Sequence, residues 1–151
     1  MKALFVGLGS IGQRHLRNLK ALRPNIEIHA FRSSHSSPLL SETNQVIPDE
    51  DIKNFYNIKE FNNLNDALRC KPDIVFVTNP TSFHLDVAVK ALESGAHIFL
   101  EKPISHSFDG VAEFLKIEQS YKKNKVFVGY QFRYNPALIL VKKLLDENKI
   151  G

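Results

Sequence analysis

The chain has 151 residues, of which 43% are hydrophobic and 24% are charged. This length fits one domain of ordinary size, because compact domains most often have about 100 to 150 residues. The composition excludes disordered, collagen-like and coiled-coil chains. The single cysteine, Cys70, excludes an intrachain disulfide framework, so a reducing, cytoplasmic setting is the simpler expectation.

Membranes and nucleic acids are not expected partners. No apolar run approaches the roughly 18 residues that a membrane-spanning helix needs, and the apolar stretch at 3–6 ends too soon for a signal peptide. The formal charge of +4 admits a basic nucleic-acid-binding module as an alternative. However, most of the clustered lysines fall on or beside stretches with helical apolar spacing, which is typical of solvated helix faces. A modest positive field also favours an anionic small ligand.

Short β-branched and aromatic runs alternate with longer stretches of 3.6-residue apolar spacing. The continuous apolar run at 74–77 indicates a strand buried on both faces, as in a parallel sheet covered by helices. The pattern predicts an α/β fold of the Rossmann type. Its doubly wound, mostly parallel sheet lies in three α/β/α layers and binds ligands outside the carboxyl ends of the strands. The expected strands are 3–7, 26–31, 58–61, 74–78, 97–100 and 126–130.

Three helices are expected at 11–22, 83–93 and 136–147. The first places Ile11, His15, Leu19 and Leu22 along one face. The serine-rich segment 33–57 is interpreted as an irregular excursion between the second and third strands. The final residues after 147 resemble a cut at a domain boundary, so we expect residues 1–151 to be one domain of a longer protein.

The first motif is a glycine-rich turn between the first strand and the first helix. Gly7-Leu8-Gly9-Ser10-Ile11-Gly12 matches G-x-G-x-x-G in the context that dinucleotide binding requires. The first glycine permits the tight turn, the second admits a pyrophosphate, and the third lets the helix and strand pack closely. A glycine-rich turn that binds no nucleotide, or a methyltransferase-type loop, is the alternative.

The residue type that selects NAD is missing at the expected place. NAD-binding proteins hold the ribose with an acidic residue about 20 positions after the motif, but this chain has Arg32 there, followed by Ser33 and Ser34. A guanidinium and two hydroxyls suit the 2′-phosphate of NADP. We therefore expect NADP to be preferred over NAD, unless Arg32 is only a surface residue at a strand end.

Two further loops follow the fourth and fifth strands at the same edge of the sheet. The first loop contains Asn79, Pro80 and His84, although His84 alone is more easily explained as a structural histidine. The second contains Glu101 and Lys102. A lysine that ends a buried strand is a candidate acid or base, its pKa lowered by desolvation or by a nearby oxidised nicotinamide. The alternative is a lysine that has left the sheet and reaches water.

Together these motifs resemble the Gfo/Idh/MocA family, the glucose-fructose oxidoreductase and inositol dehydrogenase group. The segments that carry the resemblance are Gly-Leu-Gly-Ser-Ile-Gly, Asn-Pro-Thr-Ser-Phe-His, Gly-Ala-His-Ile-Phe-Leu-Glu-Lys-Pro and Gly-Tyr-Gln-Phe-Arg-Tyr. The resemblance covers nearly the whole chain. It implies an N-terminal NAD(P)-binding Rossmann domain, followed by a second domain that binds substrate and usually mediates oligomerisation.

The resemblance also implies roles for individual residues. Lys102 would lie beside the nicotinamide and substrate, either transferring the proton or tuning the residue that does. Asn79, Pro80, His84 and Glu101, with Arg133, would line the cofactor cleft. No metal is expected.

The resemblance implies an NAD(P)-dependent oxidoreductase acting on a sugar, polyol or sugar nucleotide. The isolated domain would be inactive, and the whole protein would be a homo-oligomer. The alternative is a non-catalytic, nucleotide-sensing regulatory protein of the same fold.

Overall fold

The computed structural model describes residues 1–32, 38–123 and 125–150. In this part of the chain, six strands form one sheet in the order β3-β2-β1-β4-β5-β6, and every neighbouring pair is parallel. This confirms the predicted doubly wound α/β fold. The strands are β1 (Lys2–Val6), β2 (Glu27–Phe31), β3 (Lys59–Phe61), β4 (Ile74–Val77), β5 (His97–Leu100) and β6 (Val126–Val128).

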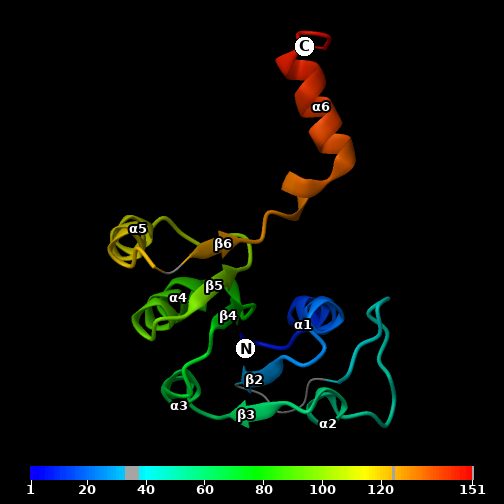
Figure 1. Ribbon diagram of the computed structural model, residues 1–151, viewed down its shortest axis with the longest axis vertical. Helices are drawn as coiled ribbons and strands as arrows, with labels where there is room; N and C mark the ends of the chain where they lie inside the picture. Colours follow the sequence, from blue (N-terminus) through cyan, green and yellow to red (C-terminus); the bar gives the residue numbers. More distant parts are fainter. Residues whose placement is uncertain (33–37, 124, 151) are drawn as a thin grey trace.

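Helices cover both faces of the sheet and give the three expected layers. Figure 1 shows α1 and α2 on one face, and α3, α4 and α5 on the other. The α-helices are α1 (Ser10–Leu22), α2 (Ile52–Tyr56), α3 (Leu64–Arg69), α4 (His84–Glu93), α5 (Val111–Ser120) and α6 (Pro136–Asp146). Two 3₁₀ turns are η1 (Thr81–Phe83) and η2 (Gln131–Tyr134).

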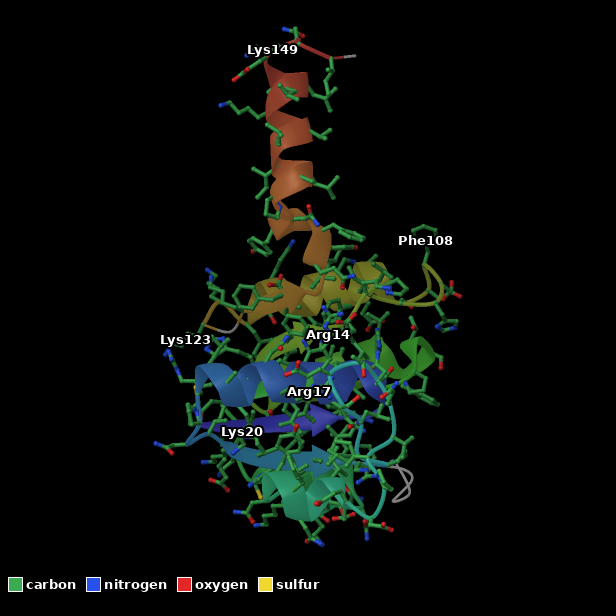
Figure 2. The ribbon with its side chains drawn as sticks, turned by 90° about the vertical axis from the view of Figure 1, so that its right-hand side faces the viewer. Arg14, Arg17, Lys20, Phe108, Lys123 and Lys149 are labelled. Atoms are coloured by element: carbon green, nitrogen blue, oxygen red, sulfur yellow. The ribbon has the colours of Figure 1, made fainter. Side chains whose placement is uncertain are left out.

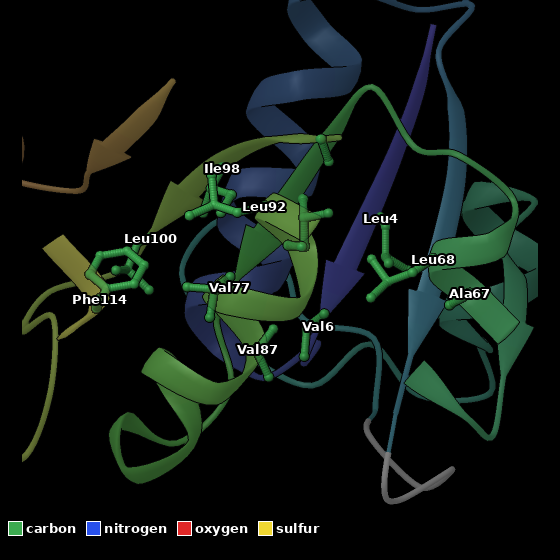
Figure 3. Close-up of a cluster of buried hydrophobic side chains, with 14 residues drawn as sticks. Leu4, Val6, Ala67, Leu68, Val77, Val87, Leu92, Ile98, Leu100 and Phe114 are labelled. Carbon is green, nitrogen blue, oxygen red and sulfur yellow. The ribbon is translucent and has the colours of Figure 1, made fainter. Parts of the chain in front are cut away.

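The central strands are apolar throughout because they contribute to two hydrophobic clusters. In β1, Leu4 and Val6 face the cluster beneath α3, α4 and α5, which Figure 3 shows in close-up. Ala3 and Phe5 face the opposite cluster beneath α1 and α2. This alternation follows from the two-residue period of a strand. It explains why the sequence shows continuous apolar runs in place of alternating polar and apolar residues.

The segment 33–57 is not irregular throughout, contrary to the sequence interpretation. It contains α2, whose first residue, Ile52, is fully buried against the sheet. The Asp51 carboxylate accepts a hydrogen bond from the Asn54 backbone N–H at 2.9 Å, and Asn57 ends the helix in the left-handed conformation. The helix is only five residues long, so its apolar spacing is too short to be recognised.

The predicted apolar face of α1 is partly wrong. Leu22 is 71% exposed, whereas Leu16, which was not assigned to that face, is fully buried. His15 is half-buried, and its ring has a polar partner after the end of β5, described below. The buried face is rotated from the predicted one, because Leu16 and Leu19 lie on one side of the helix. Leu22 lies past the last buried turn of the helix.

The last helix extends away from the sheet (Figure 1). None of the described residues of α6 is buried, and it leaves several apolar side chains exposed, among them Ile139 and Leu140. Within the described part of the chain, no helix is long and apolar enough to cross a membrane.

Candidate functional site

The glycine-rich turn places three glycines in three different environments. Gly7 has a φ of +94°, and a Cβ there would lie 2.9 Å from the Asn79 backbone. A Cβ on Gly12 would lie 2.5 Å from the Gly7 carbonyl oxygen, so only glycine lets α1 approach β1 this closely. Gly9, the N-cap of α1, has open space around its Cβ position. The turn is therefore tightly packed at both ends and open in the middle, beside Ser10 and the first amides of α1.

A cleft of about 330 Å³ lies beside this turn, where β4 and β5 end. Its walls come from α1, from the loop after β4 and from the loop after β5, so segments far apart in the sequence meet there. This edge is the switch point of the sheet, because β1 pairs with β2 on one side and with β4 on the other. The lining residues are Ile11, Arg14, Thr78, Asn79, Pro80, Thr81, His84, Glu101, Lys102 and Gln131.

A second hollow of about 400 Å³ shares Asn79 and Pro80 with the cleft. Its other walls are mostly apolar and include Phe31 at the end of β2, Leu64 at the start of α3 and Phe83 before α4. The two hollows adjoin through the loop after β4. A polar cleft and an apolar hollow thus lie along the carboxyl edge of the sheet.

His84 joins the loops that follow β4 and β5. The ring is 1% exposed, with Nδ1 2.9 Å from the Pro103 carbonyl oxygen and Nε2 2.9 Å from the Asn79 carbonyl oxygen. Both partners are carbonyl oxygens, so the buried ring lies between two hydrogen-bond acceptors. His84 thereby connects the wall of the cleft to the residue that follows Lys102.

Glu101 is the buried member of the Glu-Lys-Pro segment. It is 6% exposed, and its Oε1 lies 2.6 Å from His15 Nε2 on α1. Its Oε2 accepts a hydrogen bond from the Lys102 backbone N–H at 3.2 Å. The sequence analysis placed His15 only on a helix face, because no local pattern shows that α1 crosses the end of β5.

Lys102 lines the cleft, and its side chain is not desolvated. β5 ends at Leu100, two residues earlier, and Lys102 is exposed. The chain has already turned away from the sheet there, which agrees with the alternative of a lysine that reaches water. Any catalytic role for Lys102 must therefore come from its place in the cleft.

Arg32 is not the surface residue considered as an alternative. Its side chain is 3% exposed, and Nη1 donates to the Glu60 Oε1 at 2.6 Å. Nη2 is buried and has no hydrogen-bond partner among the described residues. Ser33 and Ser34, which were grouped with Arg32, lie outside the described residues.

Arg133 lies outside the cleft in this structure. It is exposed on η2 and lines a separate hollow with Phe99 and the residues of β6. Gln131, two residues earlier, lines the cleft instead. Which residue of this 3₁₀ turn reaches the cleft depends on how the turn is oriented. The sequence motif does not specify that orientation.

Arg14 is a second cleft residue that the sequence analysis missed. Figure 2 shows Arg14, Arg17 and Lys20 along α1. Arg17 donates to the Leu40 carbonyl oxygen and Lys20 to the Ile26 carbonyl oxygen, each at 3.0 Å, whereas Arg14 lines the cleft. The one signal was its position two residues after Gly12, within the first turns of the helix that follows the glycine motif.

Comparison with known proteins identifies the family. Residues 1–130 match the model of the Gfo/Idh/MocA oxidoreductase family, which describes an NAD-binding Rossmann fold. The chain belongs to this family. The resemblance inferred from the motifs is thus confirmed, and these residues form an oxidoreductase-type NAD-binding domain.

Similar proteins include inositol dehydrogenases. The chain is 29% identical to inositol 2-dehydrogenase of Salmonella typhimurium strain LT2, covering 100% of this chain and 43% of the relative. It is 28% identical to scyllo-inositol 2-dehydrogenase (NAD(+)) of Bacillus subtilis, covering 100% and 42%. The structure of scyllo-inositol dehydrogenase from Lactobacillus casei, with bound NAD(H) and scyllo-inositol, superposes with a TM-score of 0.80 at 26% identity. The superposition covers 100% of this chain and 42% of the Lactobacillus casei chain. The chain therefore spans less than half the length of these relatives.

The residues of the site fit a dinucleotide. Open space at Gly9 leaves room for a pyrophosphate beside the α1 amides, where the helix dipole favours an anion. Asn79 Oδ1 is buried without a hydrogen-bond partner among the described residues, so it can accept from a ligand. The apolar second hollow suits a nucleobase, and the polar cleft beside Lys102 suits the nicotinamide half.

Proposed function

We propose that this domain binds NAD(P) along the carboxyl edge of its sheet. The pyrophosphate lies over Gly9 and the first turn of α1, and the adenosine occupies the hollow between Phe31 and Phe83. The nicotinamide lies in the cleft with Glu101 and Lys102. The observation that carries this assignment is the contrast among the three glycines of the motif, since of Gly7, Gly9 and Gly12 only Gly9 has free space where a Cβ would be.

We further propose that the whole protein is a dehydrogenase of polyols or sugars. The inositol dehydrogenases among its relatives favour catalysis over a regulatory sensor and favour a polyol substrate. The nicotinamide supplies the chemistry by accepting or donating a hydride at the substrate carbon. Lys102 contributes an amino group at the cleft, which accepts the substrate hydroxyl proton as the free amine during oxidation and returns it as the ammonium during reduction, or which tunes the residue that does so.

The substrate residues are proposed to lie in a second domain that also mediates homo-oligomer formation. Two observations support this arrangement: the relatives are longer than this chain, and α6 and η2 expose apolar side chains. Sequencing the gene beyond codon 151 tests the proposal, and an in-frame stop codon there would contradict it. A reducing, cytoplasmic setting is proposed from the single cysteine.

A Gly9→Ala variant tests cofactor binding. The φ of −68° and the free space at Gly9 both accept alanine, so the unfolding free energy should stay equal or rise by about 0.4–1 kcal/mol. The added methyl group occupies the space proposed for the pyrophosphate, so NADH affinity should fall at least about tenfold, a loss of about 1.4 kcal/mol.

NADH fluorescence titration measures the affinity, and urea unfolding measures the stability. Gly12→Ala is the matched comparison, because its Cβ would meet the Gly7 carbonyl oxygen and should lower stability directly. Unchanged NADH affinity in Gly9→Ala would overturn the proposed placement of the pyrophosphate.

A further inference from the structure

We propose that His15 is a positioning residue for Lys102 and acts through the Glu101 carboxylate. This proposal rests on the proposed function only in taking Lys102 as a site residue. His15 itself is not among the cleft-lining residues. It touches neither cofactor nor substrate in the proposed arrangement, so its effect must pass through its partner.

The contact between His15 and Glu101 joins α1 to the end of β5. Residues two apart on an extended strand face the same side, so Phe99 and Glu101 both face α1. The His15 ring packs on Phe99 with centroids 4.7 Å apart, and its Nε2 lies 2.6 Å from Glu101 Oε1. The ring is thus held by an aromatic neighbour while its nitrogen meets the carboxylate.

The Glu101 carboxylate has little freedom to move. A Cβ on Gly129 would lie 3.0 Å from Oε1, so the chain after β6 closes tightly over this oxygen. The second oxygen, Oε2, accepts from the Lys102 backbone N–H. His15 therefore fixes one oxygen of a carboxylate whose other oxygen holds the backbone of Lys102, and a short chain of contacts runs from α1 to the cleft.

A buried carboxylate oxygen that loses its hydrogen-bond partner turns towards another partner or towards water. Loss of the His15 contact therefore frees the Glu101 carboxylate to turn, and this weakens its hold on the Lys102 N–H. The Lys102 side chain has no burial of its own to fix it. The direction of its ammonium group therefore depends on how firmly its backbone is held.

A second histidine–glutamate pair lies away from the cleft, and in it the histidine is buried and the glutamate is exposed. His29 Nε2 lies 2.6 Å from Glu27 Oε1, and the His29 ring packs against Phe61 with centroids 5.3 Å apart. In this pair the hydrogen bond from His29 lowers the pKa of Glu27. Both residues lie on β2, and neither lines either hollow.

Two substitutions at His15 separate positioning from packing. His15→Gln retains an N–H donor for Glu101, whereas His15→Phe retains the aromatic contact with Phe99 and removes the donor. His29→Phe is the control, because it removes the same kind of hydrogen bond from the other pair. For each variant and the wild type, the measurements are amide hydrogen exchange at Lys102 without cofactor and NADH affinity.

The proposal predicts that exchange at Lys102 becomes about fivefold faster or more in His15→Phe, the factor expected for loss of a hydrogen bond worth about 1 kcal/mol. His15→Gln and His29→Phe should retain the wild-type exchange rate at Lys102. NADH affinity should change little in either variant, because His15 does not touch the cofactor and Lys102 is proposed to act on the hydroxyl proton.

Wild-type exchange in His15→Phe, or equal acceleration in His15→Gln and His15→Phe, would overturn the proposal. If His15→Phe does not fold, the wild-type ¹⁵N spectrum of the imidazole decides, because an Nε2 without a proton could not donate to Glu101. Failure of NADH to bind the wild type would overturn the proposed function. Exchange at Lys102, measured without cofactor, would still decide the role of His15.

Discussion

At the residue scale, the ion pair of Arg32 with Glu60 changes what the arginine can contribute to cofactor binding. The Arg32 guanidinium is buried, and the Glu60 carboxylate offsets its charge, so Arg32 does not offer an unpaired positive charge to a phosphate. The buried Nη2, however, has no partner among the described residues, and a phosphate oxygen is an acceptor that would satisfy it. We propose that NADP is preferred over NAD on this basis.

Arg32→Ala tests this choice of cofactor. Loss of a charge-assisted hydrogen bond should weaken NADPH binding about tenfold and leave NADH binding within about twofold. Parallel fluorescence titrations of both reduced cofactors measure the two affinities. Glu60→Gln is the companion variant, because it retains an acceptor beside Nη1 while removing the opposing charge, and it should strengthen NADPH binding. Equal affinities of the wild type for NADPH and NADH would remove Arg32 from cofactor selection.

At the scale of elements, the site depends on how loops after different strands are tied together. The loop after β4 and the loop after β5 meet at His84, the first residue of α4. This single ring orders two walls of the cleft at once. The arrangement needs no direct contact between the loops, since both use carbonyl oxygens towards the same imidazole.

His84→Leu should therefore destabilise the domain. Leucine fills similar space but donates nothing, so the carbonyl oxygens of Asn79 and Pro103 lose their partner. The expected loss is about 1–3 kcal/mol of unfolding free energy, the cost of leaving buried polar groups unsatisfied. Urea unfolding measures it, with Ser82→Ala on the exposed face of η1 as the control. A loss no greater than that of Ser82→Ala would mean that these hydrogen bonds add little stability.

Patterns that are local in sequence were predictable, and contacts between elements were not. The glycine-rich turn and the strands at 74–77 and 97–100 follow from short-range sequence, because their residues satisfy nearby backbone and packing needs. The partnership of His15 with Glu101 spans 86 positions. Likewise, the sequence places Lys102 after a buried strand but does not tell which residue is the last one buried.

At the scale of the whole molecule, the sheet brings together residues that the chain keeps far apart. Parallel strands place all their carboxyl ends at one edge, so the turn at Gly9 and the segment at Lys102 lie along the same edge of the sheet. We propose that this sheet edge forms only the cofactor-binding half of a dehydrogenase site. The apolar side chains of α6 lie on a helix that follows β6, the outermost strand of the sheet, and that has no buried residue in the described chain.

This division predicts that the 151-residue chain binds NADH but does not reduce NAD⁺ with myo-inositol or scyllo-inositol. The cleft beside Lys102 is open, and the proposed partner groups for the substrate lie in the second domain.

In the whole protein, Lys102→Ala should lower kcat far more than it lowers cofactor affinity, because the lysine amino group is proposed to act on the hydroxyl proton. Steady-state absorbance of NADH and fluorescence titration measure the two quantities. Lys116→Ala, exposed on α5 and lining neither hollow, is the control for loss of a positive charge away from the site. Turnover by the isolated chain would place the substrate residues within these 151 positions, and an unchanged kcat in Lys102→Ala would exclude Lys102 from the chemistry.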